Sequence, residues 1–116
     1  MNILRNKHKM QNYSREYLLS HGFRYRKASF TDDVDVYTYR FPVYKYNKQS
    51  LIDCTLTVNP NDGDVFISVT QQDGCIYTPF YANDYGNFRP IMEIINSNIL
   101  HQFSKLSISV VNEEWY

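Results

Sequence analysis

Alternating apolar and polar residues in the middle of the chain predict an antiparallel sheet with one buried face. From Leu51 to Asn59 every second residue is apolar, namely Ile52, Cys54, Leu56 and Val58. The alternation resumes after the turn-forming stretch 59–64, at Val65, Ile67 and Val69. Strands whose second face meets water show this period of two. Because Pro60 and Gly63 favour a tight turn between the two runs, they indicate a hairpin.

The segment Val34 to Tyr46 is the longest candidate strand, and its two faces carry different rows. One row consists of Tyr37, Tyr39, Phe41 and Val43, and the other includes Arg40, Tyr44 and Tyr46. Pro42 has no N–H to donate to a sheet, so we expect a bulge or an edge position there. Shorter strands are expected from Phe23 and from Leu106.

Two helices flank these strands. The first is expected after an N-cap at Asn12 or Ser14, and Gly22 supplies the residue that ends it. The second begins near Pro90, and its apolar stripe consists of Ile91, Ile94, Ile95, Ile99 and Phe103. A stripe of this width needs a sheet face to cover it.

These elements predict an α+β fold with a single antiparallel sheet of four to five strands. The N-terminal and C-terminal helices are expected to pack on one face of that sheet. The length of 116 residues suits one domain, which we place at residues 12–111. Residues 1–11 show no apolar period and are expected to form a flexible basic arm, and residues 112–116 a tail.

The formal net charge is zero, but it is unevenly distributed along the chain. Residues 1–48 carry ten basic and four acidic side chains, and residues 49–116 carry two basic and eight acidic ones. The halves therefore differ as +6 and −6, which indicates a basic patch if folding keeps the halves apart. Aromatic residues make up 16% of the chain, and 11 of them are tyrosines.

Catalytic, metal and cofactor patterns are absent from the sequence. His8, His21 and His101 have no metal-ligand spacing, and Cys54 and Cys75 form no CxxC pair. The chain has no phosphate-binding glycine motif. We therefore expect a protein without enzymatic activity, metal or cofactor. No run of about 18 apolar residues and no secretory signal is found, so the expected location is the cytoplasm.

The tyrosine excess favours a protein-binding function. Tyrosine and arginine dominate protein interfaces because they bury much area and still form hydrogen bonds. The partner would be another protein or a second copy of this chain. The candidate interface residues are Tyr37, Tyr39, Tyr44, Tyr46, Tyr81, Tyr85 and Arg89. The last three belong to an aromatic loop whose phenylalanines, Phe80 and Phe88, are expected to point inward.

The alternative hypothesis is a module that binds single-stranded nucleic acid. Cations interleaved with aromatic rings on adjacent strands are how sheet surfaces hold single strands. The candidate residues lie in the basic half of the chain and are Arg24, Arg26, Lys27, Arg40 and Lys45.

Three segments carry a resemblance to known proteins. These segments are the tyrosine-rich strand from Tyr37 to Tyr46, the alternating strand from Leu51 to Val58, and the loop from Pro79 to Asn87. In these the sequence resembles small uncharacterised proteins carried by phages and mobile elements of Gram-positive bacteria. The resemblance covers residues 12–108 and implies an accessory protein. It implies no activity and no site residues.

Overall fold

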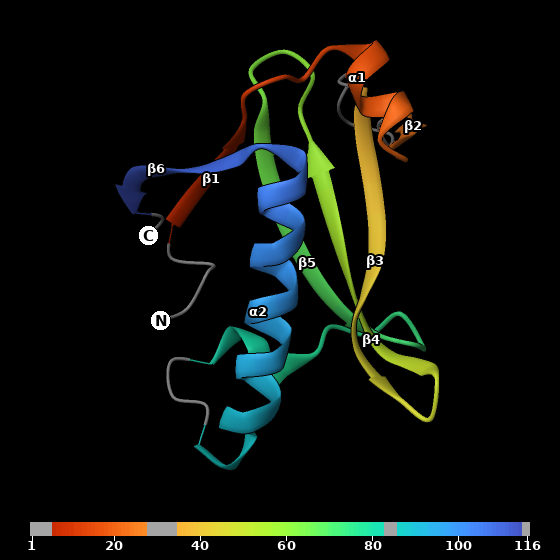
Figure 1. The fold of residues 1–116 in the computed structure, drawn as a ribbon, viewed down its shortest axis with the longest axis vertical. Helices are drawn as coiled ribbons and strands as arrows, with labels where there is room; N and C mark the ends of the chain where they lie inside the picture. Colours follow the sequence, from red (N-terminus) through yellow and green to blue (C-terminus); the bar gives the residue numbers. More distant parts are fainter. Residues whose placement is uncertain (1–5, 28–34, 83–85, 115–116) are drawn as a thin grey trace.

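One antiparallel sheet and one long helix make up most of the computed structural model, which describes residues 6–27, 35–82 and 86–114 (Figure 1). The elements follow in the order β1 (Asn6–Met10), α1 (Arg15–Ser20), β2 (Arg24–Arg26), β3 (Val36–Tyr46), β4 (Gln49–Val58), β5 (Asp64–Gln71), η2 (Thr78–Tyr81), η3 (Gly86–Phe88), α2 (Arg89–Leu106) and β6 (Ile108–Glu114). The two η elements are short 3-10 turns.

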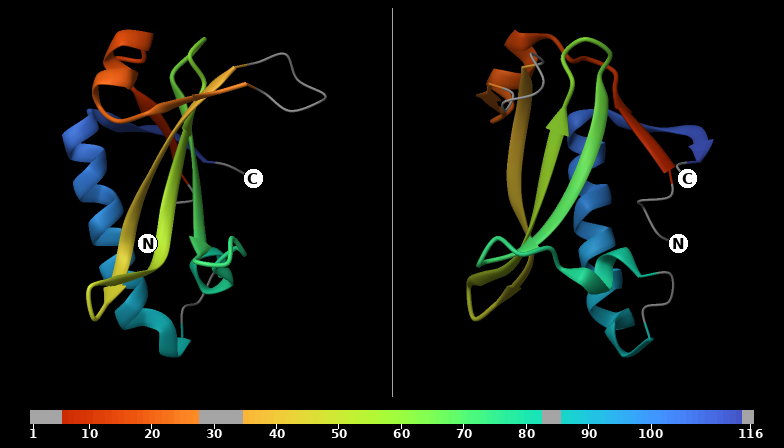
Figure 2. Two further views of the ribbon diagram at one scale, coloured as in Figure 1. Left: turned by 90° about the vertical axis from the view of Figure 1, so that its right-hand side faces the viewer. Right: turned by 180° about the vertical axis from the view of Figure 1, so that it is seen from behind.

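The sheet has the strand order β2-β3-β4-β5-β1-β6, and every neighbouring pair is antiparallel. It curls into a half-barrel around α2. Figure 2 (left) shows α1 and α2 on the same side of the sheet. The predicted α+β class with two helices on one face is therefore confirmed, while the sheet has six strands instead of four or five.

The core lies between α2 and the inner face of the sheet. The helix buries one stripe of side chains, which consists of Met92, Ile95, Ile99, Phe103 and Leu106. The predicted strand row Ile52, Cys54, Leu56 and Val58 faces this stripe and is buried throughout. Ile94, expected in the helical stripe, is exposed because it lies about 200° around the helix from Met92. Each fully buried aliphatic side chain contributes about 1.5–3 kcal/mol to folding.

The long strand β3 contains a β-bulge at Val43, and the bulged residue contacts helix α2. Pro42 pairs with Asp53 and Tyr44 with Ile52, so Val43 is the extra residue, as the proline in this strand predicts. Its side chain is buried, and its carbonyl oxygen accepts a hydrogen bond of 2.7 Å from the Asn98 side chain of α2. The bulge turns Tyr44 toward the inner face, and the hydrogen bond fixes the sheet against the helix.

The short helix α1 begins and ends at the predicted residues. The Ser14 hydroxyl oxygen accepts a hydrogen bond of 3.2 Å from the backbone N–H of Tyr17, which identifies Ser14 as the N-cap. Gly22 follows the helix with a φ of +92°, in the left-handed region. Leu18 is fully buried, and the Tyr17 hydroxyl donates to the Leu106 carbonyl at 3.3 Å. These contacts attach α1 to the C-terminal end of α2.

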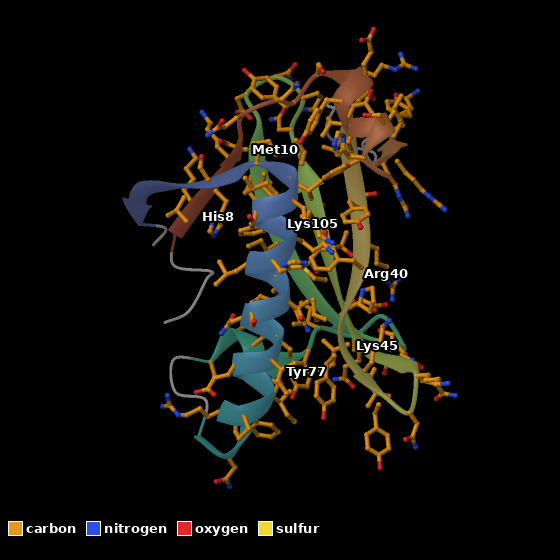
Figure 3. All side chains as sticks on the ribbon, in the orientation of Figure 1. His8, Met10, Arg40, Lys45, Tyr77 and Lys105 are labelled. Atoms are coloured by element: carbon orange, nitrogen blue, oxygen red, sulfur yellow. The ribbon has the colours of Figure 1, made fainter. Side chains whose placement is uncertain are left out.

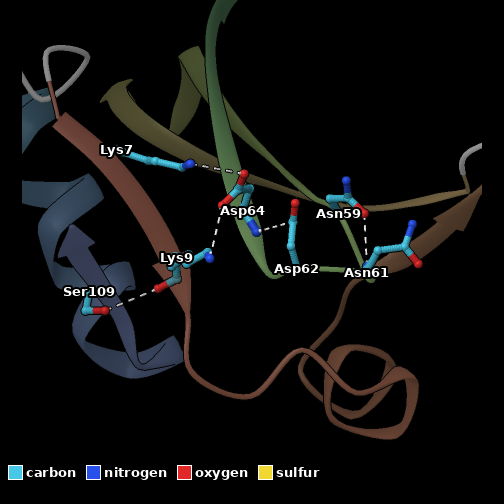
Figure 4. A network of polar contacts seen from close by, with 7 residues as sticks. All are labelled: Lys7, Lys9, Asn59, Asn61, Asp62, Asp64 and Ser109. Atoms are coloured by element: carbon cyan, nitrogen blue, oxygen red, sulfur yellow. Dashed lines mark hydrogen bonds and ion pairs between the residues drawn. The ribbon is translucent and has the colours of Figure 1, made fainter. Parts of the chain in front are cut away.

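The expectation of a flexible arm is wrong for residues 6–10, which form the interior strand β1. This strand pairs with β5 on one side and with β6 on the other. His8 and Met10 are buried, while Lys7 and Lys9 lie 3.5 Å and 3.8 Å from the carboxylate of Asp64 (Figure 4). The sequence did not indicate the strand because Met10 is its single buried apolar residue. Its stability comes from backbone pairing on both sides, and the same pairing extends β6 into the expected tail.

Met10 provides a test of this position. Substitution Met10→Ala removes a side chain that is 2% exposed and should lower the free energy of unfolding by about 2–5 kcal/mol. The matched control is Gln11→Ala, whose exposed side chain should change stability by less than about 0.5 kcal/mol. Urea denaturation followed by circular dichroism measures both. Equal effects of the two substitutions would contradict the placement of β1 in the sheet.

Candidate functional site

Within the described ranges, no α-helix covers the outer face of the sheet, which is rich in small hydroxyl side chains. The register places Thr38 opposite Thr57, and Thr57 opposite Phe66. Arg40 lies opposite Thr55, which in turn lies opposite Ser68. The alternate residues of these strands are the buried row described above, so this hydroxyl-rich face is the one that meets solvent (Figure 2).

Three arginines of this face converge at the edge of the sheet. In β2, Arg24 pairs with Thr38 and Arg26 pairs with Val36, so both arginine side chains share the face of Arg40. They surround a hollow of about 480 Å³, named here the arginine hollow, which is lined by Gly22, Arg24, Arg26, Thr38, Tyr39, Arg40, Phe41, Pro42 and Asp53. Three of the five predicted nucleic-acid residues thus lie together.

One of these arginines is fixed by a carboxylate. The Arg40 Nε donates to Asp53 Oδ2 at 2.8 Å, and Nη2 lies 2.7 Å from the same oxygen. The Ser50 hydroxyl donates to the other oxygen of Asp53. Within the described ranges, no ion pair joins Arg24 or Arg26 to a carboxylate. Three arginines and one aspartate therefore leave the arginine hollow with a formal charge of about +2.

The other two predicted cations lie elsewhere. Lys27 is exposed just beyond β2 and does not line the arginine hollow. Lys45 is also exposed, but it lies farther along β3 toward the β3–β4 turn, as Figure 3 shows by its distance from Arg40. The structure therefore brings Arg24, Arg26 and Arg40 together and separates the two lysines from them.

Most of the tyrosines of β3 do not reach the uncovered face. Tyr37 is 5% exposed. Tyr39 packs against Phe41 with ring centroids 5.5 Å apart, and Tyr44 contacts the core. Tyr46, which is 63% exposed, is the one tyrosine of this strand in open contact with solvent. The bulge explains the difference, because it turns Tyr44 inward before the turn that carries Tyr46.

The aromatic loop closes one end of the core. Phe80 is fully buried, and the Tyr81 hydroxyl accepts a hydrogen bond of 3.0 Å from the backbone N–H of Val69. Phe88, expected to point inward, is 48% exposed, because it directly precedes α2 at the end of the molecule. Arg89 is exposed, and Tyr85 lies outside the described residues.

A second hollow lies on the other side of β2. This tyrosine pocket measures about 780 Å³ and is lined by Gln11, Asn12, Tyr13, Ser14, Arg15, Tyr25, Asp35, Tyr37 and Pro60. The rings of Tyr25 and Tyr37 meet edge to face, with centroids 5.7 Å apart. A hydrogen bond with Asp35 raises the pKa of the Tyr25 hydroxyl. The sequence did not indicate this pocket, because Tyr13, Tyr25 and Asp35 come from separate segments of the chain.

In the described part of the chain, the cysteine, histidine and carboxylate side chains form no cluster typical of a catalytic or metal site. Cys54 is fully buried in the core, and burial raises the pKa of its thiol, which disfavours a reactive thiolate. Among the described residues, no three His, Cys, Asp or Glu side chains gather as metal ligands. No helix in these residues is long and apolar enough to span a membrane.

Comparison with known proteins gives no match, whether to a family model, a curated protein or a solved structure. The resemblance to proteins of phages and mobile elements therefore stays a prediction.

The two cysteines allow a direct check of the core. In the folded protein near pH 8, Cys75 should react rapidly with a thiol reagent because it is exposed, whereas Cys54 should stay protected. Denaturant should expose the second thiol. Cys75→Ser serves as the control, since it should abolish the rapid reaction and leave one thiol that reacts only after unfolding. A rapidly reacting Cys54 in the folded chain would contradict its position.

Proposed function

We propose that this protein binds single-stranded nucleic acid, with the arginine hollow contacting its phosphates. The observation that supports this proposal is the convergence of Arg24, Arg26 and Arg40 on one concave part of an uncovered sheet face. Guanidinium groups form paired hydrogen bonds with phosphate oxygens and stay charged at any physiological pH. Because Asp53 neutralises one cation, Arg24 and Arg26 provide the available charge.

The surroundings of the arginine hollow fit a nucleic-acid backbone. Hydroxyl side chains such as Thr38 and Thr55 commonly contact phosphate and sugar. Positive charge is concentrated at β2, where Lys27 continues the run of Arg24 and Arg26. On β1, by contrast, Lys7 and Lys9 lie against the carboxylate of Asp64. An anionic strand would therefore be attracted to this edge of the sheet.

A single strand fits this surface better than a duplex. Reading the major groove of a duplex needs a helix or a two-stranded ribbon that projects into it. The arginines instead lie on the face of a curled sheet, and the neighbouring helix α1 has six residues. A single strand can follow the edge of a sheet and leave its bases free for contact with aromatic rings.

The test is binding of a fluorescently labelled single strand, measured by anisotropy. Substitution of either Arg24→Gln or Arg26→Gln should raise the Kd about tenfold, the equivalent of about 1.5 kcal/mol for a charge-assisted hydrogen bond. Each substitution should also reduce the dependence of log K on log salt concentration by about 0.7 for the lost phosphate contact.

The matched control is Arg89→Gln, which removes the same charge at the start of α2. This arginine lies at the opposite end of the molecule from β2 (Figure 1). Its substitution should leave the Kd within about twofold, because screening weakens interactions between charges farther apart than a Debye length. Equal losses from Arg89→Gln and Arg24→Gln would mean nonspecific attraction, and no binding at low salt would remove the proposal.

A protein-binding function is the second candidate, supported by an apolar hollow at the far end of the sheet. This hollow of about 500 Å³ is lined by Tyr44, Leu51, Ile52, Gln71, Gln72, Asp73, Tyr77 and Ile91. Exposed Tyr46 and Ile76 add apolar surface beyond this hollow's own lining. Contiguous exposed apolar surface favours contact with another protein.

Self-association provides the test of this second candidate. If a second copy covers the apolar hollow, sedimentation velocity should show a dimer whose population increases with concentration. Substitution Tyr46→Ala should then shift the protein toward monomer, whereas Arg24→Gln, in the arginine hollow, should not. A protein that stays monomeric at high concentration would exclude the second copy as the occupant.

A further inference from the structure

The tyrosine pocket and the arginine hollow lie on opposite sides of one edge strand. Side chains alternate along a strand, so Tyr25 points away from the face that Arg24 and Arg26 share. Among the described strands, β2 stands at the edge of the sheet and has one neighbour, β3. A chain-like ligand can therefore cross β2 with one part on each side. A nucleotide could bind in this way, because its phosphate and its base lie at opposite ends and could each occupy one side of β2.

The tyrosine pocket has the size and the rings to hold a base. Its volume of about 780 Å³ lies within the range of small-molecule sites, which spans about 300–1,000 Å³. The Tyr25 side chain is 49% exposed, so a face of its ring is open to a stacking partner. Tyr37 supports this ring from the side, at an interplanar angle of 66°. Tyr13 completes the aromatic lining.

Asp35 adds a carboxylate acceptor to a pocket whose lining combines three tyrosines with the polar residues Gln11, Asn12, Ser14 and Arg15. The carboxylate of Asp35 lines the pocket together with Tyr25, and it raises the pKa of the Tyr25 hydroxyl. An ionised carboxylate offers about four lone-pair positions, so acceptor capacity remains for a ligand. Cytosine presents an amino group that donates to such a carboxylate. Thymine presents the O4 carbonyl oxygen at the equivalent position, where two acceptors would repel each other.

We infer that the tyrosine pocket is a base subsite that selects cytosine over thymine, with Tyr25 stacking on the base and Asp35 accepting from its amino group. This inference rests on the proposed function, because the phosphate of the same strand occupies the arginine hollow. It extends that function from contact with the backbone to a preference among bases.

The experiment compares two labelled homopolymers of equal charge, oligo(dC) and oligo(dT), each about 12 nucleotides long. Because the phosphates are identical, the ratio of the two Kd values isolates the base contact. Oligo(dC) should bind about five to tenfold more tightly than oligo(dT). Substitution Asp35→Asn should bring the ratio close to one, because an amide can donate to O4 of thymine as well as accept from cytosine.

Two further variants separate stacking from hydrogen bonding. Tyr25→Ala should weaken both homopolymers about tenfold, since it removes the stacking ring. Tyr25→Phe keeps the ring and should preserve the affinity for both. Circular dichroism of each variant checks its folding, which should be unchanged because the Tyr25 side chain is 49% exposed.

The outcomes distinguish the inference from the function on which it rests. If neither homopolymer binds, the proposed function fails and the base subsite with it. If both bind equally, depend on Arg24 and do not respond to Asp35→Asn, the function stands and the base subsite is overturned. A lysine-rich peptide is the third probe. If it quenches the tyrosine fluorescence and neither homopolymer does, the base subsite is overturned in favour of a site for a cationic ligand.

Discussion

The apolar stripe of α2 determines how the rest of the molecule is arranged. A helix of 18 residues that buries Met92, Ile95, Ile99, Phe103 and Leu106 needs apolar surface around a broad arc of its circumference. A flat sheet cannot supply that arc, whereas a sheet curled into a half-barrel can. The bulge at Val43 bends the long strand toward the helix, and Asn98 holds the bulged carbonyl. The curl and the helix therefore stabilise each other.

The need to cover the apolar stripe of α2 also determines which face of the sheet the aromatic residues occupy. The row that contains Tyr37, Tyr39 and Phe41 covers the helical side, because these rings supply the area that the curled core needs. The outer face then holds the alternate residues, among which are short hydroxyl side chains, three arginines, Asp53 and the exposed ring of Phe66. For this reason the tyrosine excess of the sequence is mainly a property of the core, and the exposed chemistry of the sheet is cationic.

The pairing of the strands also determines how far the basic and acidic halves of the sequence stay apart in the folded protein. Strands of the basic half neighbour strands of the acidic half at β3–β4, at β5–β1 and at β1–β6, so Arg40 meets Asp53 while Lys7 and Lys9 meet Asp64. The edge strand β2 has β3, another strand of the basic half, as its one described neighbour, and no ion pair among the described residues neutralises Arg24 or Arg26. The basic patch that the sequence indicated is thus reduced to one edge, beside the tyrosine pocket.

The sequence alone determined the features that depend on local periodicity and backbone chemistry. These are the hairpin of β4 and β5, the N-cap at Ser14, the helix that starts near Pro90, and the bulge required by Pro42. The arginines of the candidate site were also visible in the sequence. Only the tertiary structure revealed that β1 is an interior strand of the sheet and that the tyrosine pocket exists. The reason is physical: β1 is stabilised by partners far away in the chain, and the pocket gathers Tyr13, Tyr25 and Asp35 from separate segments, so no local pattern records either of them.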